Sequence, residues 1–125
     1  MLILDAGAFV AAERGDRDLV ALVKRERLAG RPPVTNGGVV ARVWRGGRGR
    51  QVPVARLLAG TEVVPVDDVL GRRAGRLLAA SGGSDAVDAA VVCLAADGDD
   101  ILTSDPADLR AVAEAAGAHV ELIAI

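Results

Sequence analysis

The stretch Met1-Leu-Ile-Leu-Asp5 and the similar stretch Ile101-Leu-Thr-Ser-Asp105 decide the fold of this chain. Each is a short apolar run that is followed within two residues by an aspartate. Such runs are too short for a helix and are typical of strands that are buried on both faces. Strands of this kind form parallel sheets that helices cover on both sides, so the two stretches predict an α/β fold.

Helices and further strands are expected to alternate over the rest of the chain. Capping residues and apolar spacing predict helices at residues 6–14, 16–29, 36–44, 52–59, 85–96 and 105–116, and one that starts at Asp67 or Asp68 and runs to residue 80. Further strands are predicted at residues 34–35, 62–66 and 119–125. Ser84 is expected to cap the helix that follows it, and Gly46-Gly47 to end the helix that contains Trp44. Strands alternating with helices favour a parallel sheet with helices on both faces.

The composition excludes several classes of protein. The chain has 125 residues, 51% of them hydrophobic, with one Cys, one His and no Tyr. This is the size of one domain, and we expect a single domain over residues 1–125. One Cys excludes a disulfide framework, and one His excludes a His-rich metal site. No apolar run approaches the roughly 20 residues that span a bilayer, and no basic leader precedes Asp5, so we expect a cytoplasmic protein without a membrane partner.

Charge is unevenly distributed along the chain, although the net charge is only -2. Between Glu26 and Glu62 there is no acidic residue but there are seven arginines, namely Arg27, Arg31, Arg42, Arg45, Arg48, Arg50 and Arg56. Between Arg76 and Arg110 there is no basic residue but there are seven aspartates, namely Asp85, Asp88, Asp97, Asp99, Asp100, Asp105 and Asp108. The first segment would attract polyanions and the second would attract cations.

Four aspartates are candidates for one functional site. Asp5 and Asp105 each follow a strand, and sites in parallel sheets form beyond the carboxyl ends of the strands. The alternative role for each is that of a helix cap. Asp85 and Asp88 lie three residues apart and share a helix face. The residues around Asp88 are otherwise apolar and no Lys or Arg is near in sequence, so its charge needs a partner, for which a metal ion is suited.

Carboxylates without Cys or His ligands suit a hard cation, Mg²⁺ or Mn²⁺. Such an ion can activate water and stabilise the charge that develops during phosphodiester cleavage. The sequence therefore predicts a Mg²⁺ or Mn²⁺ site formed by Asp5, Asp85, Asp88 and Asp105, with arginines that hold a polyanionic substrate.

Three segments, in this order, carry a family resemblance: Leu2-Ile-Leu-Asp5-Ala-Gly-Ala-Phe9 with Glu13-Arg14, then Ser84-Asp-Ala-Val-Asp88-Ala, then Leu102-Thr-Ser-Asp105-Pro-Ala-Asp108-Leu. They resemble the PIN-domain ribonucleases, and in particular the VapC-type toxins of bacterial toxin–antitoxin systems. The resemblance implies an α/β/α sandwich around a parallel sheet of about five strands. It also implies a Mg²⁺- or Mn²⁺-dependent endoribonuclease that acts on RNA, forms a homodimer and binds an antitoxin protein.

The resemblance also assigns roles to individual residues. Asp5, Asp88 and Asp105 correspond to catalytic, metal-binding acids, and Asp85 to an additional acid one turn earlier. Thr103 and Ser104 correspond to the hydroxyl residues beside the last acid. The family's second acid, normally Glu, falls at Arg42, a residue of opposite charge.

An arginine among carboxylates pairs with one of them and competes with a metal ion. Three interpretations of Arg42 stay open: it contacts the scissile phosphate beside a bound metal, it turns out to solvent, or it leaves a module that binds RNA or antitoxin but cleaves weakly or not at all. A phosphoryl-transfer domain built on Asp5 is a less favoured function, because no second Asp lies two residues further on.

Overall fold

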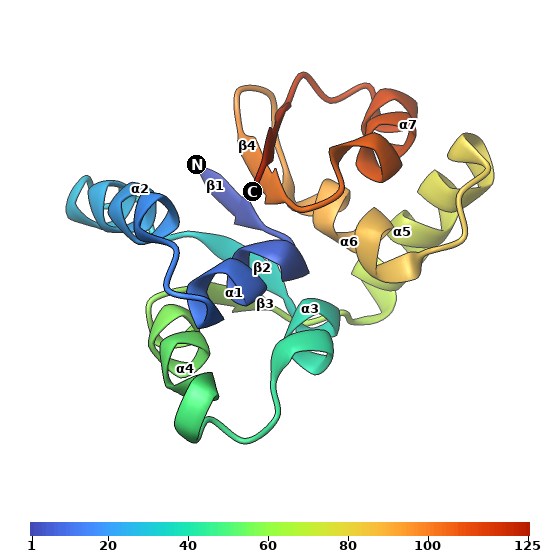
Figure 1. Cartoon of the computed structure of the whole chain (residues 1–125). Coiled ribbons are helices and arrows are strands. Elements are labelled where there is room, and N and C mark those ends of the chain that lie inside the picture. The colour runs from blue at the N-terminus through green and yellow to red at the C-terminus, as the bar shows by residue number, and fades with distance from the viewer.

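The computed structural model describes residues 1–125, and it contains one sheet of five strands (Figure 1). The strands are β1 (Leu2–Leu4), β2 (Val34–Asn36), β3 (Glu62–Val64), β4 (Asp100–Thr103) and β5 (Glu121–Ala124). The helices are α1 (Ala6–Glu13), α2 (Arg17–Leu28), α3 (Gly37–Val43), α4 (Val52–Ala59), α5 (Asp68–Ser81), α6 (Ala86–Leu94) and α7 (Pro106–Ala116). All neighbouring strands are parallel, in the order β3-β2-β1-β4-β5. The predicted α/β class is therefore confirmed.

Helices cover both faces of the sheet. On one side α1 packs against β1 and β4 and contacts α2, α3 and α4; on the other side α6 packs against β1 and β2 and contacts α5 and α7. Figure 1 shows these two groups of helices at opposite sides of the central strands. This is an α/β/α sandwich, as the family resemblance implied.

The central strands are apolar because both of their faces are covered. Ile3 of β1 lies between Val34 of β2 and Ile101 of β4 in the sheet register. Ile3 and Ile101 are fully buried, and Phe9 of α1 and Val91 of α6 are buried on either side of the sheet. Burial of each such side chain contributes roughly 1.5–3 kcal/mol, so this core fixes the strand ends that carry the candidate site.

Several predicted boundaries need correction. Ser84 does not cap α6; Asp85 does, and the helix begins at Ala86 and ends at Leu94 rather than at residue 96. Its early end follows from the extended backbone of Ala95. The last strand begins at Glu121 rather than at residue 119, and the backbone of His119 is bonded instead to the connection before β4: its N–H donates to Asp97 and its carbonyl accepts from Gly98.

Trp44 lies outside α3 and outside the core. Its backbone is extended, so the helix ends at Val43. The indole is 39% exposed and covers Gly47, where a Cβ would come within 2.4 Å of the ring. Trp44 therefore does not pack in the core of the domain. The one cysteine, Cys93, is only partly buried.

No single helix is long and apolar enough to cross a membrane. Helices α5 and α6 taken together have the length and apolar composition of a membrane span, but they are bent by 108° relative to each other.

Candidate functional site

The carboxyl ends of β1 and β4 lie at the centre of the candidate site. The chain adds β2 and β3 on one side of β1 and later places β4 and β5 on the other side. The connections that leave β1 and β4 therefore run in opposite directions across the sheet. Parallel sheets bind ligands at the point where the strand order reverses in this way. Asp5 follows β1, and Ser104 and Asp105 follow β4, so the fold brings together residues that are about 100 positions apart.

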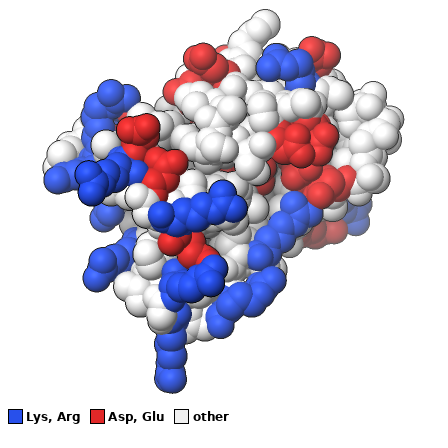
Figure 2. Space-filling model, in the orientation of Figure 1, with Lys and Arg blue, Asp and Glu red and all other residues white.

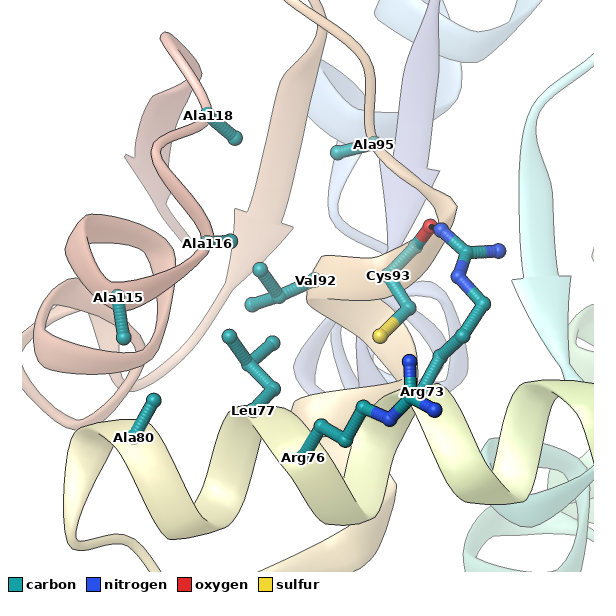
Figure 3. Close-up of a pocket in the computed structure, with 10 residues that line it drawn as sticks. All are labelled: Arg73, Arg76, Leu77, Ala80, Val92, Cys93, Ala95, Ala115, Ala116 and Ala118. Carbon is teal, nitrogen blue, oxygen red and sulfur yellow. Dashed lines mark hydrogen bonds between the residues drawn. The ribbon is translucent and has the colours of Figure 1, made fainter.

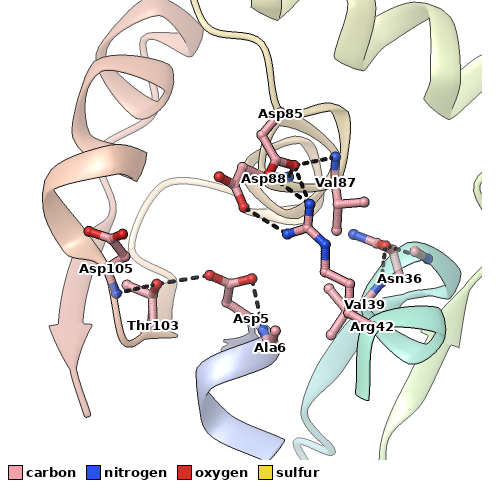
Figure 4. Close-up of polar contacts among 11 residues, drawn as sticks. Asp5, Ala6, Asn36, Val39, Arg42, Asp85, Val87, Asp88, Thr103 and Asp105 are labelled. Atoms are coloured by element: carbon pink, nitrogen blue, oxygen red, sulfur yellow. Dashed lines mark hydrogen bonds and ion pairs between the residues drawn. The ribbon is translucent and has the colours of Figure 1, made fainter. Parts of the chain in front are cut away.

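Asp5 is only 7% exposed and is held from two sides. Its Oδ1 accepts the N–H of Ala6 at 2.8 Å, and its Oδ2 accepts the hydroxyl of Thr103 at 2.8 Å (Figure 4). The Thr103 hydroxyl, itself fully buried, accepts the N–H of Asp105 at 3.0 Å. Asp5 therefore caps α1, the alternative that the sequence allowed, while it also borders the pocket described below.

Gly7 allows the first turn of α1 to approach the residues after β4. A Cβ at position 7 would lie 2.6 Å from the backbone nitrogen of Ser104 and 2.7 Å from its side chain. Since a backbone atom cannot move aside as a side chain can, this position has room only for glycine. Ser104 consequently lies against α1 at the edge of the pocket.

Helix α6 brings two further aspartates to the same edge of the sheet. The Oδ1 of Asp85 accepts the N–H groups of Val87 and Asp88, both at 3.0 Å, as the cap of the helix. The side chain of Asp88, in the first turn, is only 19% exposed. Glycine at position 38 lets α3 lie against α6, since a Cβ there would be 2.9 Å from Val87.

Arg42 projects from the end of α3 toward these two aspartates. Its Nη2 is 2.7 Å from Oδ1 and 2.6 Å from Oδ2 of Asp85, and its Nη1 is 3.5 Å from Oδ1 of Asp88. Figure 4 shows the guanidinium directed at both carboxylates. The interpretation that Arg42 turns out to solvent is therefore wrong for this conformation.

A pocket of about 210 Å³ brings nearly all the predicted site residues together. Its lining comprises Asp5, Ala6, Gly7, Arg42, Asp85, Asp88, Ser104, Asp105, Asp108 and Leu109. Thr103 lies beneath this lining, bonded to Asp5. Asp108 is the one acidic residue of the pocket that sequence reasoning left out of the site, although its spacing of three from Asp105 on a helix indicates a shared face.

The pocket holds more negative than positive charge, and this shifts several pKa values. Burial, together with the charges of Asp85 and Asp5, raises the pKa of Asp88 to about 6, against a smaller opposite effect of Arg42. Burial alone would raise the pKa of Asp85, but the hydrogen bond from Arg42 and those from backbone N–H groups hold it below its usual value. The hydrogen bond to Asp85 likewise raises the pKa of Arg42.

The second pair of acids, Asp105 and Asp108 at the start of α7, shows the same excess of negative charge. The pKa of the exposed Asp108 is raised by its hydrogen bond to Asp105 and by the charge of that residue.

The donor chemistry of the pocket fits the predicted Mg²⁺ or Mn²⁺. Five aspartates and the Ser104 hydroxyl offer oxygen ligands, with Arg42 as the one basic side chain in the lining, and hard divalent cations prefer such oxygens. However, no three acidic, His or Cys side chains of the chain lie close enough to hold an ion as they stand. Binding therefore requires the carboxylates to move together, and Arg42 to give up at least part of its contacts.

Asn36, at the carboxyl end of β2, is a further polar residue in this region. It is fully buried, and its Oδ1 caps α3 by accepting the N–H groups of Gly38 and Val39 at 2.8 and 3.0 Å. Its Nδ2 has no hydrogen-bond partner. Asn36 thus orients the helix that carries Arg42. An unpaired buried donor lowers stability, so this cap comes with an energetic cost.

Basic side chains lie beside the acidic pocket. Figure 2 shows basic side chains over the lower part of the view, where Figure 1 has α3, α4 and the connection between them, below a compact acidic group; further basic side chains lie at the left, over α2. Arg45, Arg48 and Arg50 belong to this connection, and Arg50 is 3.7 Å from Glu13 of α1. The charge asymmetry of the sequence thus becomes an asymmetry of the surface.

A second hollow, of about 400 Å³, lies among α5, α6 and α7 (Figure 3). It is lined mostly by apolar side chains, five of them alanines, with Arg73 and Arg76 among them. Arg73 donates to the carbonyl of Cys93 at 3.0 Å, and burial raises the pKa of the Cys93 thiol. Without a carboxylate or a paired nucleophile, this hollow lacks the chemistry of the acidic pocket.

No protein-family model matches the sequence, and no curated protein is significantly similar to it. Solved structures do match in fold. One is a chain of the crystal structure of VapBC2 from Rickettsia felis bound to a DNA fragment from their promoter, with a TM-score of 0.71 and 10% sequence identity. The match covers 97% of this chain and 97% of that chain. At this identity the likeness is one of fold, and it confirms the PIN-like α/β/α architecture.

Proposed function

We propose that this chain is a Mg²⁺- or Mn²⁺-dependent endoribonuclease, and that it is the toxin of a toxin–antitoxin pair. One observation carries the proposal: Asp5, Asp88 and Asp105, from three distant segments, border one pocket where the strand order reverses. The likeness in fold to a chain of the VapBC2 structure supports it further. A cytoplasmic location and a homodimer belong to the same proposal.

In this proposal Asp5, Asp88 and Asp105 hold the metal ion, with Asp85 as an additional acid. When bound, the ion supplies an activated water and stabilises the negative charge that develops on phosphorus. Thr103 acts through Asp5: its hydroxyl holds one oxygen of that carboxylate, and the N–H of Ala6 holds the other. The orientation of Asp5 is thus set before any ligand arrives, which lowers the cost of binding.

The arginines and Ser104 serve the substrate. Arg42 lies in the pocket, and Arg45 and Arg48 lie on the adjoining connection. Guanidinium groups bind phosphate oxygens strongly, through bidentate hydrogen bonds. They would hold the RNA backbone so that one phosphodiester reaches the acids, while the Ser104 hydroxyl lies close enough to the pocket to bond a phosphate or its leaving oxygen.

A second function is favoured by one specific contact. The pairing of Arg42 with Asp85 and Asp88 gives these carboxylates a built-in counter-charge. A pocket neutralised in this way would suit a module that binds RNA or an antitoxin without cleaving. The antitoxin would be a partner under both functions.

Cleavage of RNA by the purified chain tests the proposal. We expect cleavage in Mg²⁺ or Mn²⁺ and none in excess EDTA. Asp5→Asn and Asp88→Asn should abolish it, because each removes a charged ligand while it keeps the size of the side chain. Asp18→Asn, an exposed position on α2, is the matched control and should cleave like the wild type.

Equal cleavage in EDTA would overturn the metal mechanism. Binding of RNA without cleavage in either metal, together with an Arg42→Glu variant that gains Mn²⁺ binding, would favour the non-catalytic module instead.

A further inference from the structure

Arg42 is the only basic residue that lines the acidic pocket, and it contacts carboxylates that a metal ion would also bind. Its guanidinium lies 2.6 Å from Asp85 and 3.5 Å from Asp88. Asp88 is one of the three proposed metal ligands. A guanidinium and a divalent cation repel each other at such short range, so the two cannot both be held by the same carboxylates at full strength.

The contact between Arg42 and the acids is not sealed from solvent. The side chains of Arg42 and Asp85 are each 40% exposed. An ion pair of this kind contributes little to stability and can be exchanged for another partner at small cost. The structure therefore permits Arg42 to leave the acids without disturbing the core.

A neighbouring pocket can accommodate the side chain of Arg42 once it leaves the acids. A pocket of about 330 Å³ lies directly beside the acidic one, and Arg42 lines both. Its other lining residues include Glu13 and Arg45. In this hollow the guanidinium would meet the carboxylate of Glu13 instead of Asp85, and it would join the arginines of the connection between α3 and α4.

Phosphate groups are the ligands that would draw Arg42 in that direction. The side chain of Arg45 donates only to backbone carbonyls, at 2.6 and 3.1 Å, and Arg48 makes no ion pair. These two side chains are thus available to a polyanion. Because Arg45 lines the same pocket as Arg42, an RNA backbone bound to these side chains adds negative charge near Arg42 on the side of that pocket.

We propose that Arg42 is an exchangeable counter-ion: a phosphodiester of bound RNA draws its guanidinium away from Asp85 and Asp88, and only then are these carboxylates free for a divalent cation. This inference rests on the proposed function and adds regulation to it. The RNA-free protein is held in a metal-poor state, and RNA and metal bind cooperatively. Because coupling between two ligands is reciprocal, the metal also strengthens the binding of RNA by the same factor.

Mn²⁺ binding, measured by electron paramagnetic resonance and calorimetry, tests this without any readout of cleavage. The titrations compare wild type, Arg42→Gln, Arg42→Lys and Arg45→Gln, each with and without a short RNA whose linkages are phosphorothioates. For the wild type we expect RNA to tighten Mn²⁺ binding at least about 10-fold, within the usual range of such couplings.

The variants separate exchange at Arg42 from general electrostatics. Arg42→Gln should bind Mn²⁺ about 10-fold more tightly than wild type without RNA, and RNA should then add less than about threefold, since the coupling that remains is small. Arg42→Lys keeps the charge and should stay close to wild type. Arg45→Gln removes one charge from the same surface and should leave RNA-free Mn²⁺ binding unchanged.

Two failures can be told apart. If wild type and Arg42→Gln bind Mn²⁺ equally without RNA, or if Arg45→Gln gains as much as Arg42→Gln, the exchange is overturned while the proposed metal site stands. If no variant binds Mn²⁺ with or without RNA, the proposed function is overturned and this inference with it.

Discussion

The hydroxyl of Thr103 donates a hydrogen bond of 2.8 Å to Oδ2 of Asp5, and this bond joins the ends of the two central strands β4 and β1. Both residues are buried, and the same hydroxyl accepts the N–H of Asp105. Two polar groups at the base of the acidic pocket, the Asp5 carboxylate and the Asp105 N–H, therefore depend on this one side chain.

Replacing Thr103 by Val should destabilise the protein by about 1.5–3 kcal/mol, because it leaves a buried carboxylate oxygen and a backbone N–H without partners at nearly constant volume. Thr103→Ser keeps the hydroxyl and should cost only about 1 kcal/mol for the lost methyl group. Urea unfolding of the three proteins measures both values. A Val variant as stable as the Ser variant would contradict the role given to the hydroxyl.

Gly7→Ala should lower the free energy of unfolding by roughly 1–3 kcal/mol, although alanine normally favours a helix, because its Cβ would meet the backbone of Ser104. Gly71→Ala in α5 is the matched control: its Cβ would meet nothing, so the variant should gain about 0.5–1 kcal/mol. Thermal and urea unfolding measure the change in stability of both variants and show whether each is a loss or a gain. A stabilised Gly7→Ala variant would show that α1 and the β4–α7 connection are not in close contact.

The raised pKa of Asp88 predicts a specific dependence of stability on pH in the metal-free protein. A carboxyl whose pKa is about 6 in the folded protein, against an ordinary value of 3.8, binds more protons when folded. Its contribution is therefore fully present below pH 3.8 and is lost as pH rises through about 6. Asp85, whose pKa is lowered, acts in the opposite sense and below pH 3.8, outside this window.

Asp88→Asn removes this titration. The free energy of unfolding of the variant, relative to wild type, should therefore rise between pH 4 and pH 7, by at most about 3 kcal/mol. Urea unfolding in EDTA at pH 4, 5, 6 and 7 measures the difference. If the free energies of unfolding of the two proteins change with pH in parallel, the titration of Asp88 does not contribute to the stability of the protein in this pH range.

The arginines between α3 and α4 predict a salt-dependent interaction with RNA. Each phosphate that an arginine neutralises contributes about 0.7 to the slope of log affinity against log salt for a single strand. Arg48→Gln should therefore lower this slope by about that amount. Arg72→Gln, on α5 and already paired with Asp68 at 2.9 Å, is the control and should leave the slope unchanged, as fluorescence anisotropy over a salt series would show.

Much of the local structure followed from the sequence because its signals are local. Short apolar runs that lead to an aspartate predicted β1 and β4, and Asp16 and Asn36 cap the helices that they were expected to begin. Helix α5 is capped by Asp67, one of the two adjacent aspartates that were candidates for its start. The start of α6 was missed by one residue, since Ser84 and Asp85 are both good caps and sequence cannot choose between adjacent ones. The choice depends on the backbone, which is extended at Asp85.

The sequence by itself determined the α/β class and the set of aspartates at strand and helix ends, because periodicity and capping act over a few residues. Only the tertiary structure decided how these groups combine. The order of strands in the sheet brings Asp5 beside Thr103, and the packing of α3 against α6 directs Arg42 at Asp85 and Asp88. These contacts join residues 43 to 98 positions apart, and contacts at such separations are fixed by the closure of the core rather than by any local pattern.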